Sequence, residues 1–485
     1  MRRRAVQIVC TIGPSSRSVE TLRQLIDAGM AIARMNFAHG GPQEQRETVA
    51  RIRAAAAERD RPVAILQDLS GPKLRLGELH EPRLVLETGT LVTIACDRDK
   101  GEPGLLPAPD RYLAQELRPG APILIGDGSV ELEVTHVEPP EIHCRVIVGG
   151  EITSGKGIST PGGLSDRPIL DERDRADLAL GAELGVDLVG VSYVRRASDL
   201  EEVRDALAAI GRSGVLVAKI ETAVVLDHLD EVLMASDAVM IARGDLSLEI
   251  PYERVPIAQK RIVLAAIRAG RPVITATQML HSMVSAARPT RAEIADVANA
   301  VLDGTDAVML SDETAIGNDP VRACRAMRKI ADTTLEAFPD FPETPLEGIP
   351  DDLRELLVFS RAAVRTARDT GVIAILTWSR GGLAARLLSR QRPSVPILAP
   401  TRFEETWRRL TLPFGCRPLL CPDGVLQLAQ VERELGPVDG SDLVLVVSHI
   451  PGEQRRIPWM GLVRLADRDG WSRDPRDEGF RSSEQ

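Results

Sequence analysis

The chain has 485 residues and a mass of 52.6 kDa, more than one compact core usually holds, so we expect roughly two or three domains. Acidic and basic residues number 70 and 60, and the resulting net charge of −10 argues against nucleic acid or an anionic membrane as a partner. No run reaches the roughly 18 consecutive apolar residues of a membrane span. The six cysteines are scattered without a CxxC pair, so we expect no structural zinc, no disulfide framework and a cytoplasmic protein.

The first 338 residues repeat one unit: a short apolar run, a polar turn and an amphipathic helical stretch. Ser18, Asp171 and Ser198 stand where three of these helices are expected to begin. Apolar strands that alternate with amphipathic helices are typical of a parallel sheet buried on both faces. The eight strand-like runs are Val6–Ile12, Ala31–Met35, Val63–Leu66, Leu188–Val191, Val215–Ile220, Ala238–Ile241, Pro272–Ala276 and Ala307–Leu310.

Residues 77–165 break this rhythm, because glycine and proline separate short alternating strands there. Without this insertion the first 338 residues leave 249, close to the roughly 250 of an eight-fold β/α barrel. The alternative is an open doubly wound sheet, which more often has about five or six strands. We therefore predict an α/β protein with a (β/α)8 TIM barrel at 1–76 and 166–338 and a β-barrel-like cap at 77–165. The strands expected in the cap are Leu84–Leu86, Leu91–Ile94, Val130–Val134 and His143–Val148.

The region after the barrel begins with a Pro-rich linker at 339–350. It is followed by alternating helices and strands that predict a separate three-layer α/β domain at 351–466, with a regulatory or oligomerisation role. Residues 467–485 are charged and contain glycine and proline, so we expect a loose tail. The elements expected in the third domain are helix Asp352–Arg368, strand Val372–Leu376, helix Leu383–Ser389, strand Val395–Leu398 and strand Leu443–Val447.

Polar residues gather where the predicted barrel strands end, which is where the active site of such a barrel forms. Glu221 and Asp245 follow adjacent strands and can bind a hard divalent cation such as Mg²⁺. Arg34, Arg75 and Lys219 supply positive charge for a phosphate or carboxylate. The other candidates at strand ends are Asn36, His39, Asp68, Lys73, Ser192, Arg195, Arg243, Gly244, Thr275, Thr277, Ser311, Asp312 and Glu313.

Lys219 and Glu221 stand two residues apart on one strand, so their side chains point to the same face. If that face lines the barrel, both charges need a partner or a ligand, because an unpaired buried charge is too costly to keep. Charged residues at barrel mouths often only solvate loops, so spacing alone predicts no more than metal-assisted chemistry on a small anion.

A series of motifs along the chain resembles those of the pyruvate kinases, in the same order. The resemblance covers essentially the whole chain and makes residues 77–165 the mobile cap of that family. It implies transfer of the phosphoryl group of phosphoenolpyruvate to ADP, the last step of glycolysis, by a magnesium- or manganese-dependent kinase that is usually a homotetramer. The motifs are Cys10-Thr-Ile-Gly-Pro-Ser-Ser16, Ala33-Arg-Met-Asn-Phe-Ala-His-Gly40, Gln67-Asp-Leu-Ser-Gly-Pro-Lys-Leu-Arg75, Ala242-Arg-Gly-Asp-Leu246, Ala276-Thr-Gln-Met-Leu280, Arg288-Pro-Thr-Arg-Ala-Glu293, Asp296-Val-Ala-Asn-Ala-Val-Leu-Asp303 and Met309-Leu-Ser-Asp-Glu-Thr-Ala315.

The resemblance implies a catalytic role for each matching residue. Lys219 would stabilise the phosphoryl group in flight, and Arg34 would grip the phosphate. Glu221 and Asp245 would hold the metal. The substrate carboxylate would bind the backbone N–H groups of Gly244 and Asp245, a helix N-terminus that suits an anion, with the hydroxyl of Thr277. Thr277 would also relay the proton to the enolate.

The nucleotide and its phosphates would be lined by Asn36, His39, Arg75 and Lys156, again by resemblance. Gly150-Glu-Ile-Thr-Ser-Gly-Lys156 fits the spacing of a P-loop, but Gly157 stands where a P-loop has Ser or Thr, and no helix is expected to follow. We therefore reject a P-loop. A Rossmann dinucleotide site has no support either.

The expected monovalent-cation region comprises Asn36, Asp68, Leu69 and Lys73. Pyruvate kinases that require K⁺ typically have Glu at the position of Lys73, whereas relatives that do not require K⁺ have Lys. A fixed ammonium group near Asp68 can supply the charge of a bound K⁺. Ala38 stands where the family often has a serine ligand of this ion. We therefore expect no K⁺ requirement.

A possible effector site lies in the third domain, at Thr377-Trp-Ser-Arg-Gly-Gly382, where Thr377, Ser379 and Arg380 would bind a phosphate at a helix N-terminus. The resemblance implies a sugar-phosphate effector there. The second effector loop of the family is not evident, and residues 450–457 stand in its place with Glu453 beside Arg455. We expect a monophosphate effector or none.

Several positions depart from the family pattern, among them Thr222–Leu226 after the lysine motif, Ser247-Leu248 after Asp245, and Asp312. None removes an expected catalytic group, so the chain looks like a divergent member. Two alternatives remain: a metal-dependent barrel lyase or aldolase acting on pyruvate enolate, and a catalytically degenerate regulatory paralogue. The cap with Lys156 argues against the first, and the presence of Lys219 and Asp245 argues against the second.

Overall fold

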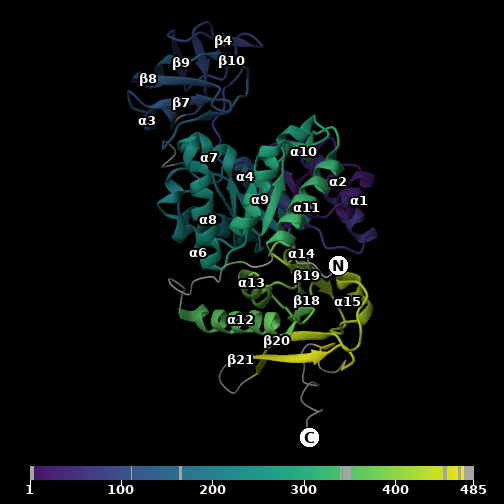
Figure 1. Ribbon diagram of the computed structural model, residues 1–485. Helices are drawn as coiled ribbons and strands as arrows, with labels where there is room; N and C mark the ends of the chain where they lie inside the picture. Colours follow the sequence, from purple (N-terminus) through teal and green to yellow (C-terminus); the bar gives the residue numbers. More distant parts are fainter. Residues whose placement is uncertain are drawn as a thin grey trace.

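A closed barrel of parallel strands forms the middle of the molecule, with the cap above it and the third domain below (Figure 1). The computed structural model describes residues 5–110, 112–162, 167–338, 341, 351–451, 456–467 and 471–473, and only the backbone of 351–353, 449–451, 456 and 457. Around the barrel the strand order is β1-β16-β15-β14-β13-β12-β3-β2. These strands are β1 (Gln7–Thr11), β2 (Met30–Asn36), β3 (Ala64–Asp68), β12 (Leu188–Val191), β13 (Val215–Ile220), β14 (Ala238–Ala242), β15 (Val273–Ala276) and β16 (Ala307–Leu310).

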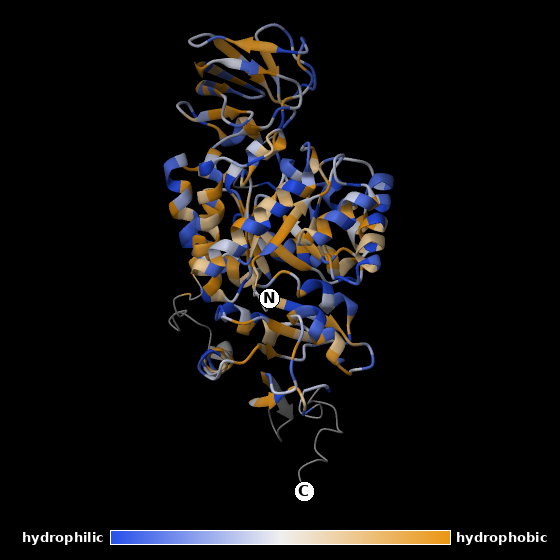
Figure 2. Cartoon of the chain, turned by 45° about the vertical axis from the view of Figure 1, so that its right-hand side comes forward, coloured by the Kyte–Doolittle hydropathy of each residue, from blue (hydrophilic) through white to orange (hydrophobic). Residues whose placement is uncertain are grey.

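All eight predicted strand-like runs form barrel strands, so the barrel prediction is confirmed and the open sheet is wrong. The strands are apolar and buried, and the helices around them turn hydrophilic faces outward (Figure 2). The helices are α1 (Val19–Asp27), α2 (Pro42–Glu58), α4 (Glu172–Leu184), α5 (Ala197–Ala209), α6 (Leu229–Ala235), α7 (Arg243–Glu249), α8 (Val255–Ala269), α9 (Arg291–Asp303), α10 (Asp312–Ala315) and α11 (Pro320–Ala337), with short 3-10 turns at Val224–Leu226, Tyr252–Arg254 and His281–Val284.

Two of the three predicted helix starts are confirmed. The hydroxyl of Ser18 accepts the backbone N–H of Thr21 at 3.0 Å, and the Asp171 carboxylate accepts that of Asp174 at 2.7 Å. Ser198 is wrong as a cap, because α5 begins one residue earlier. The carboxylate of Asp199, inside the first turn, accepts the preceding N–H groups in its place.

The cap is a curled sheet in the order β11-β7-β8-β9-β5-β6, antiparallel except for the parallel pair of β5 and β6, with a two-stranded sheet of β10 and β4 and one short helix. The four expected strands are present, and four more were missed because each is only two to four residues long. The cap elements are β4 (Leu84–Leu86), β5 (Leu91–Ala95), β6 (Leu105–Pro107), α3 (Leu113–Glu116), β7 (Pro122–Ile125), β8 (Val130–Glu138), β9 (Glu141–Val148), β10 (Gly150–Ile152) and β11 (Ile158–Ser159).

The third domain has a five-stranded sheet in the order β19-β18-β17-β20-β21, which confirms the predicted α/β class. Most of the expected linker and tail lies outside the described residues. None of the helices in the described ranges is long and apolar enough to cross a membrane. The elements are α12 (Asp351–Thr370), β17 (Ala374–Leu376), α13 (Leu383–Arg390), β18 (Ile397–Thr401), α14 (Glu404–Arg409), β19 (Cys416–Leu420), α15 (Leu428–Leu435), β20 (Leu443–Pro451) and β21 (Arg456–Arg464).

Two buried aspartates at the N-terminal ends of barrel strands join the barrel to the third domain. Asp306, just before β16, pairs with Arg392 at 3.1 Å and accepts the backbone N–H of Phe414 at 2.9 Å. Asp187, just before β12, pairs with Arg408 at 2.7 Å. We call this the lower end of the barrel, since the cap leaves from the opposite end.

Candidate active site

A chain of alternating charges crosses the upper end of the barrel, where β2, β3 and β13 finish. The guanidinium of Arg34 donates to Asp68 Oδ2 at 2.7 Å, and the ammonium group of Lys219 lies 3.1 Å from Asp68 Oδ1 and 2.8 Å from Glu221 Oε1. The side chains of Asp68 and Glu221 are only 2% and 1% exposed. Lys219 and Glu221 therefore face the same way, as the i, i+2 spacing predicted, and the structure shows that they form an ion pair with each other.

Burial and ion pairing have opposite effects on the pKa values of these charged side chains. Burial alone would lower the pKa of Lys219, but Asp68 and Glu221 outweigh it and raise that pKa, so the ammonium form is held. Burial would raise the pKa of Asp68, yet Lys219 and Arg34 lower it. Glu221 differs: burial raises its pKa, and the Asp245 carboxylate adds to the rise against the attraction of Lys219. The two carboxylates of Glu221 and Asp245 therefore repel one another, and a cation bound between them would remove that repulsion.

Lys73 forms its ion pair with Asp245, at 3.0 Å, rather than with Asp68, where its charge was expected. Among the described residues, the cations paired with Asp68 are Arg34 and Lys219. The loop that carries Lys73 extends to the cap, and the end of its side chain lies beside Gly157. The rest of the monovalent-cation region stays near Asp68, because Asn36 is its register partner on β2 and Leu69 follows it.

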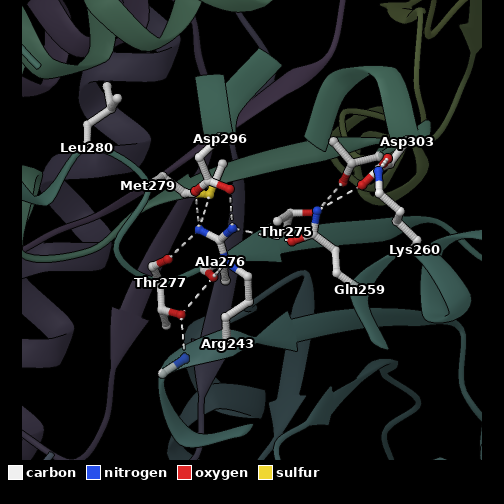
Figure 3. A network of polar contacts seen from close by, with 12 residues as sticks. Arg243, Gln259, Lys260, Thr275, Ala276, Thr277, Met279, Leu280, Asp296 and Asp303 are labelled. Carbon is white, nitrogen blue, oxygen red and sulfur yellow. Dashed lines mark hydrogen bonds and ion pairs between the residues drawn. The ribbon is translucent and has the colours of Figure 1, made fainter. Parts of the chain in front are cut away.

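Thr277 follows β15 in a left-handed backbone conformation, with φ of +67°. Its hydroxyl accepts the backbone N–H of Gly244 at 2.8 Å and donates to the carbonyl of Ala276 at 2.7 Å (Figure 3). Gly244 and Asp245 lie in the first turn of α7, and of these two the N–H of Gly244 is the one that contacts Thr277. In this structure the N–H of Gly244 is already occupied by that hydroxyl.

Three residues that support the site were not assigned a role from the sequence. The hydroxyl of Thr11, at the end of β1, accepts from Arg34 at 3.0 Å. Ser192 accepts from Lys219 at 2.7 Å, and the backbone N–H of Tyr193 donates to Glu221 at 2.7 Å. Ser192 was a candidate by its place at a strand end, and Thr11 has the same signal. A backbone donor such as Tyr193 leaves no signal in the residue type.

The four expected nucleotide residues lie at the upper end and at the base of the cap. Arg75 is exposed and donates to the carbonyl of Gly155 at 3.2 Å, which brings it beside the exposed Lys156. Asn36 accepts the N–H of Ala38 at 3.1 Å, and His39 is exposed after β2. No helix follows Lys156 within the described part of the cap before residue 163, in agreement with the rejection of a P-loop.

Other strand-end candidates prove to be structural. Arg195 is buried and pairs with Asp199 at 3.0 Å. The carboxylate of Glu313 accepts backbone N–H groups of Leu280 and Ser311, so it braces the loops after β15 and β16. The hydroxyl of Thr275 donates to that of Thr305 inside the barrel wall. These three carry no free polar group toward the site in the described structure.

The candidate effector loop, which joins β17 to α13, borders a cavity of about 340 Å³ that α12, α13 and β20 also line. Ser379 and Arg380 line this cavity together with Ser448 of β20. Thr377 is fully buried behind the loop instead of lining it, and its hydroxyl has no hydrogen-bond partner among the described residues. Glu453 and Arg455, which the sequence also brought into this prediction, fall outside the described chain.

Comparisons with known proteins agree with this arrangement. The family described as "Pyruvate kinase, barrel domain" matches residues 3–324, and "Pyruvate kinase, alpha/beta domain" matches residues 358–456. The chain is 38% identical to the pyruvate kinase of Mycobacterium tuberculosis over 457 residues, 92% of this chain and 95% of that protein. It is 43% identical to pyruvate kinase 2 of Synechocystis over 426 residues, 87% of this chain and 71% of the relative. A crystal structure of a pyruvate kinase from Cryptosporidium parvum superposes with a TM-score of 0.87 at 32% identity, covering 95% and 96% of the two chains.

The charged site at the upper end of the barrel and the similarity to these relatives together indicate a phosphotransferase. The chain belongs to the pyruvate kinase family. Neither the lyase or aldolase alternative nor the regulatory paralogue is favoured by these relatives.

Proposed function

We propose that this protein is a cytoplasmic pyruvate kinase that takes phosphoenolpyruvate and ADP to pyruvate and ATP. The observation that carries this proposal is the buried Lys219 ammonium, held charged between Asp68 and Glu221 where the strands end. A fixed cation there can stabilise negative charge on a phosphoryl group in transit. The test is pyruvate formation from phosphoenolpyruvate, measured with and without ADP. Formation that depends on ADP supports the kinase. Formation that does not depend on ADP contradicts it, because the phosphoryl group would then pass to water.

The metal in this proposal is Mg²⁺ or Mn²⁺, held by Glu221 and Asp245. The donor set fits, because both are carboxylates that repel one another and their present partners are the side-chain cations Lys219 and Lys73. In the described residues no group of three or more His, Cys, Asp or Glu is arranged to hold a metal, so the two carboxylates would need oxygen ligands from elsewhere. When bound, the metal supplies positive charge for the phosphoryl oxygens.

Two more residues at the upper end of the barrel have proposed roles in the reaction. Arg34, fixed by Thr11 and Asp68, would bind the phosphate from the side opposite Glu221. Thr277 would relay the proton to C3 of the enolate, and a substrate carboxylate would compete with its hydroxyl for the N–H of Gly244.

The nucleotide would bind between the upper end of the barrel and the cap, against Arg75 and Lys156, with Asn36 and His39 on the barrel side. The contact of Arg75 with Gly155 supports a shared surface at the cap base. We also propose that K⁺ is not required. The position of Lys73 changes the reason: its ammonium group lies against Asp245 rather than Asp68, so it adds positive charge on the metal side of the site.

We propose a homotetramer in which the third domain carries regulation. The cavity beside Ser379 and Arg380 supports a phosphate-bearing effector, and a monophosphate or no effector is favoured. The phosphoenolpyruvate saturation curve should be recorded with fructose 1,6-bisphosphate, glucose 6-phosphate, ribose 5-phosphate and AMP added separately. Strong activation by fructose 1,6-bisphosphate alone, lost in Arg455→Ala, would contradict the monophosphate proposal.

A further inference from the structure

The backbone of the turn that carries Thr277 is strained, so contacts with the surrounding structure must stabilise it. Thr277 and Gln278 are consecutive non-glycine residues in the left-handed region, with φ of +67° and +55°. Such a conformation is rare for a β-branched residue and persists only where the surrounding structure determines it. The contacts that fix this turn therefore also fix the place of the Thr277 hydroxyl.

The guanidinium of Arg243, at the start of α7, binds this turn on two successive carbonyl groups. Its Nε donates to the carbonyl of Ala276 at 3.1 Å, and its Nη2 donates to the carbonyl of Thr277 at 2.8 Å (Figure 3). Nη2 also lies 2.8 Å from the sulfur of Met279. A planar group with several donors in fixed directions can set the orientation of two peptide groups at once, which an ammonium group cannot do.

Arg243 is itself anchored from α9. Both oxygens of the Asp296 carboxylate accept from its two terminal nitrogens at 2.7 Å, and Gln259 of α8 accepts from Nη1 at 3.3 Å. The Arg243 side chain is 14% exposed. Because its charge is neutralised by Asp296 and its donors are used by the protein, Arg243 is not arranged as a cation for the substrate.

The carbonyl of Ala276 links this clamp to the hydroxyl, because it accepts from Arg243 Nε and from the Thr277 hydroxyl together. The direction of that hydroxyl is thus set by a carbonyl that Arg243 holds. We propose that Arg243 is a positioning residue for the proton-transfer half of the reaction: anchored by Asp296, its guanidinium clamps the carbonyls of Ala276 and Thr277 and aims the Thr277 hydroxyl. This inference rests on the proposed role of Thr277 as the proton relay.

The test separates proton transfer from phosphoryl transfer. With ATP and Mg²⁺ present, the enzyme in D₂O breaks a C3–H bond of pyruvate to give the enolate, and a solvent deuteron then forms a C–D bond, which proton NMR follows as loss of the methyl signal. Phosphoryl transfer is measured as ATP formed from phosphoenolpyruvate and ADP. The variants are Arg243→Met, Arg243→Lys, Thr277→Val and the double variant Arg243→Met/Thr277→Val. The matched control is Lys260→Met, which removes an outer ion pair of the same network, with Asp303.

We expect Arg243→Met to slow deuterium exchange about tenfold or more, to lower ATP formation less than about threefold, and to leave the KM for phosphoenolpyruvate within about twofold. Arg243→Lys is expected to be intermediate, and Lys260→Met to match the parent. In the Thr277→Val background, Arg243→Met should have no further effect on exchange, because both act through one hydroxyl.

Parental exchange in Arg243→Met, an equal loss of both rates, or additive effects in the double variant would overturn the inference while leaving the proposed function intact. Parental exchange in Thr277→Val would overturn the role of Thr277, and this inference with it. If Arg243→Met does not fold, Asp296→Asn replaces it, since it weakens the anchor while keeping the guanidinium. Selective slowing of exchange then supports the inference, and its absence overturns it.

Discussion

The two ends of the barrel both bury carboxylates, yet they satisfy them in different ways. At the lower end, Asp306 accepts the backbone N–H groups of Val273 and Phe414 as well as pairing with Arg392. At the upper end, Asp68 is paired with the side chains of Arg34 and Lys219. Backbone donors are fixed by the fold, whereas side-chain cations can change partners when a ligand arrives.

This difference indicates that the lower end of the barrel binds the third domain, whereas the upper end is the reactive end. The lower carboxylates have partners from the third domain, so their charge serves to hold two domains together. The upper carboxylates Glu221 and Asp245 repel one another. Glu221 accepts one backbone N–H, but the ion-pair partners of both carboxylates are side-chain cations, which can also contact a bound phosphate. Changes at the upper end should therefore lower catalysis, whereas changes at the lower end should lower stability and leave kcat unchanged.

The largest effect is expected from Lys219→Met, which removes the cation at the centre of the upper end. We expect kcat to fall roughly 10²–10³-fold, because a fixed donor at developing charge contributes on that scale. Binding of phosphoenolpyruvate should change little, since the charge that Lys219 meets develops in the transition state. Steady-state kinetics and a ligand titration check this, and unchanged kcat would remove Lys219 from the mechanism.

At the lower end, Asp306→Ala should destabilise the protein by roughly 3–5 kcal/mol, because it leaves Arg392 buried without its partner. The expected kcat of the folded fraction is that of the parent. Urea unfolding measures the free energy of unfolding, and an activity assay measures kcat. Arg322→Ala is the control, since its pair with Asp319 is exposed and should contribute less than about 1 kcal/mol. A loss of kcat in Asp306→Ala without loss of stability would contradict the separation of the two ends.

Glu221→Gln and Asp245→Asn should each raise the Mg²⁺ concentration for half-maximal activity about tenfold or more, because each removes an anionic oxygen ligand from a hard cation. The measurement is a Mg²⁺ titration of activity. Asp312→Asn provides a control, as an exposed carboxylate at the same end of the barrel. Parental Mg²⁺ curves for both variants would show that the metal binds elsewhere.

Lys73→Glu should create a K⁺ requirement of about tenfold in activity, because it replaces a fixed cation at Asp245 with an anion. The parent should be fully active in a tetramethylammonium buffer. The measurement is the activity of the parent and the variant in tetramethylammonium buffer and in K⁺ buffer. Tenfold stimulation of the parent by K⁺ would contradict the prediction that it needs no K⁺.

The smallest effect concerns Asp174, whose carboxylate accepts the backbone N–H of Gly71 in the loop before Lys73. Burial, and then Asp171, raises the pKa of Asp174 from an ordinary value of 3.8 to about 6. The folded state therefore binds the proton more tightly than the unfolded state, so this group's contribution to stability falls as the pH rises between about 4 and 6. Asp174→Asn should be more stable than the parent by about 1 kcal/mol at pH 7, which is the roughly 3 kcal/mol of a two-unit shift reduced by solvent screening, and close to it at pH 4. Urea midpoints at the two pH values test this, and a constant difference would contradict it.

Much of the fold could be predicted, because long apolar strands alternate regularly with capped helices in the barrel. The missed strands, such as β6 and β19, contain proline and are held by tertiary pairing rather than by their own residue pattern. Ser198 was misjudged as a helix start because it has the residue type of a cap, whereas the Asp199 carboxylate satisfies the N–H groups there.

The sequence by itself determined the eight-fold repeat and the family. It also determined that Lys219 and Glu221 share a face, because strand periodicity places residues i and i+2 on one side. It could not determine which carboxylate Lys73 would meet, since that depends on how a loop returns from the cap across the barrel mouth. Nor could it show that Arg243 grips the turn of Thr277 from a neighbouring helix, or that the lower aspartates join two domains. Those contacts link residues from about 30 to more than 200 positions apart, and only the packed chain brings them together.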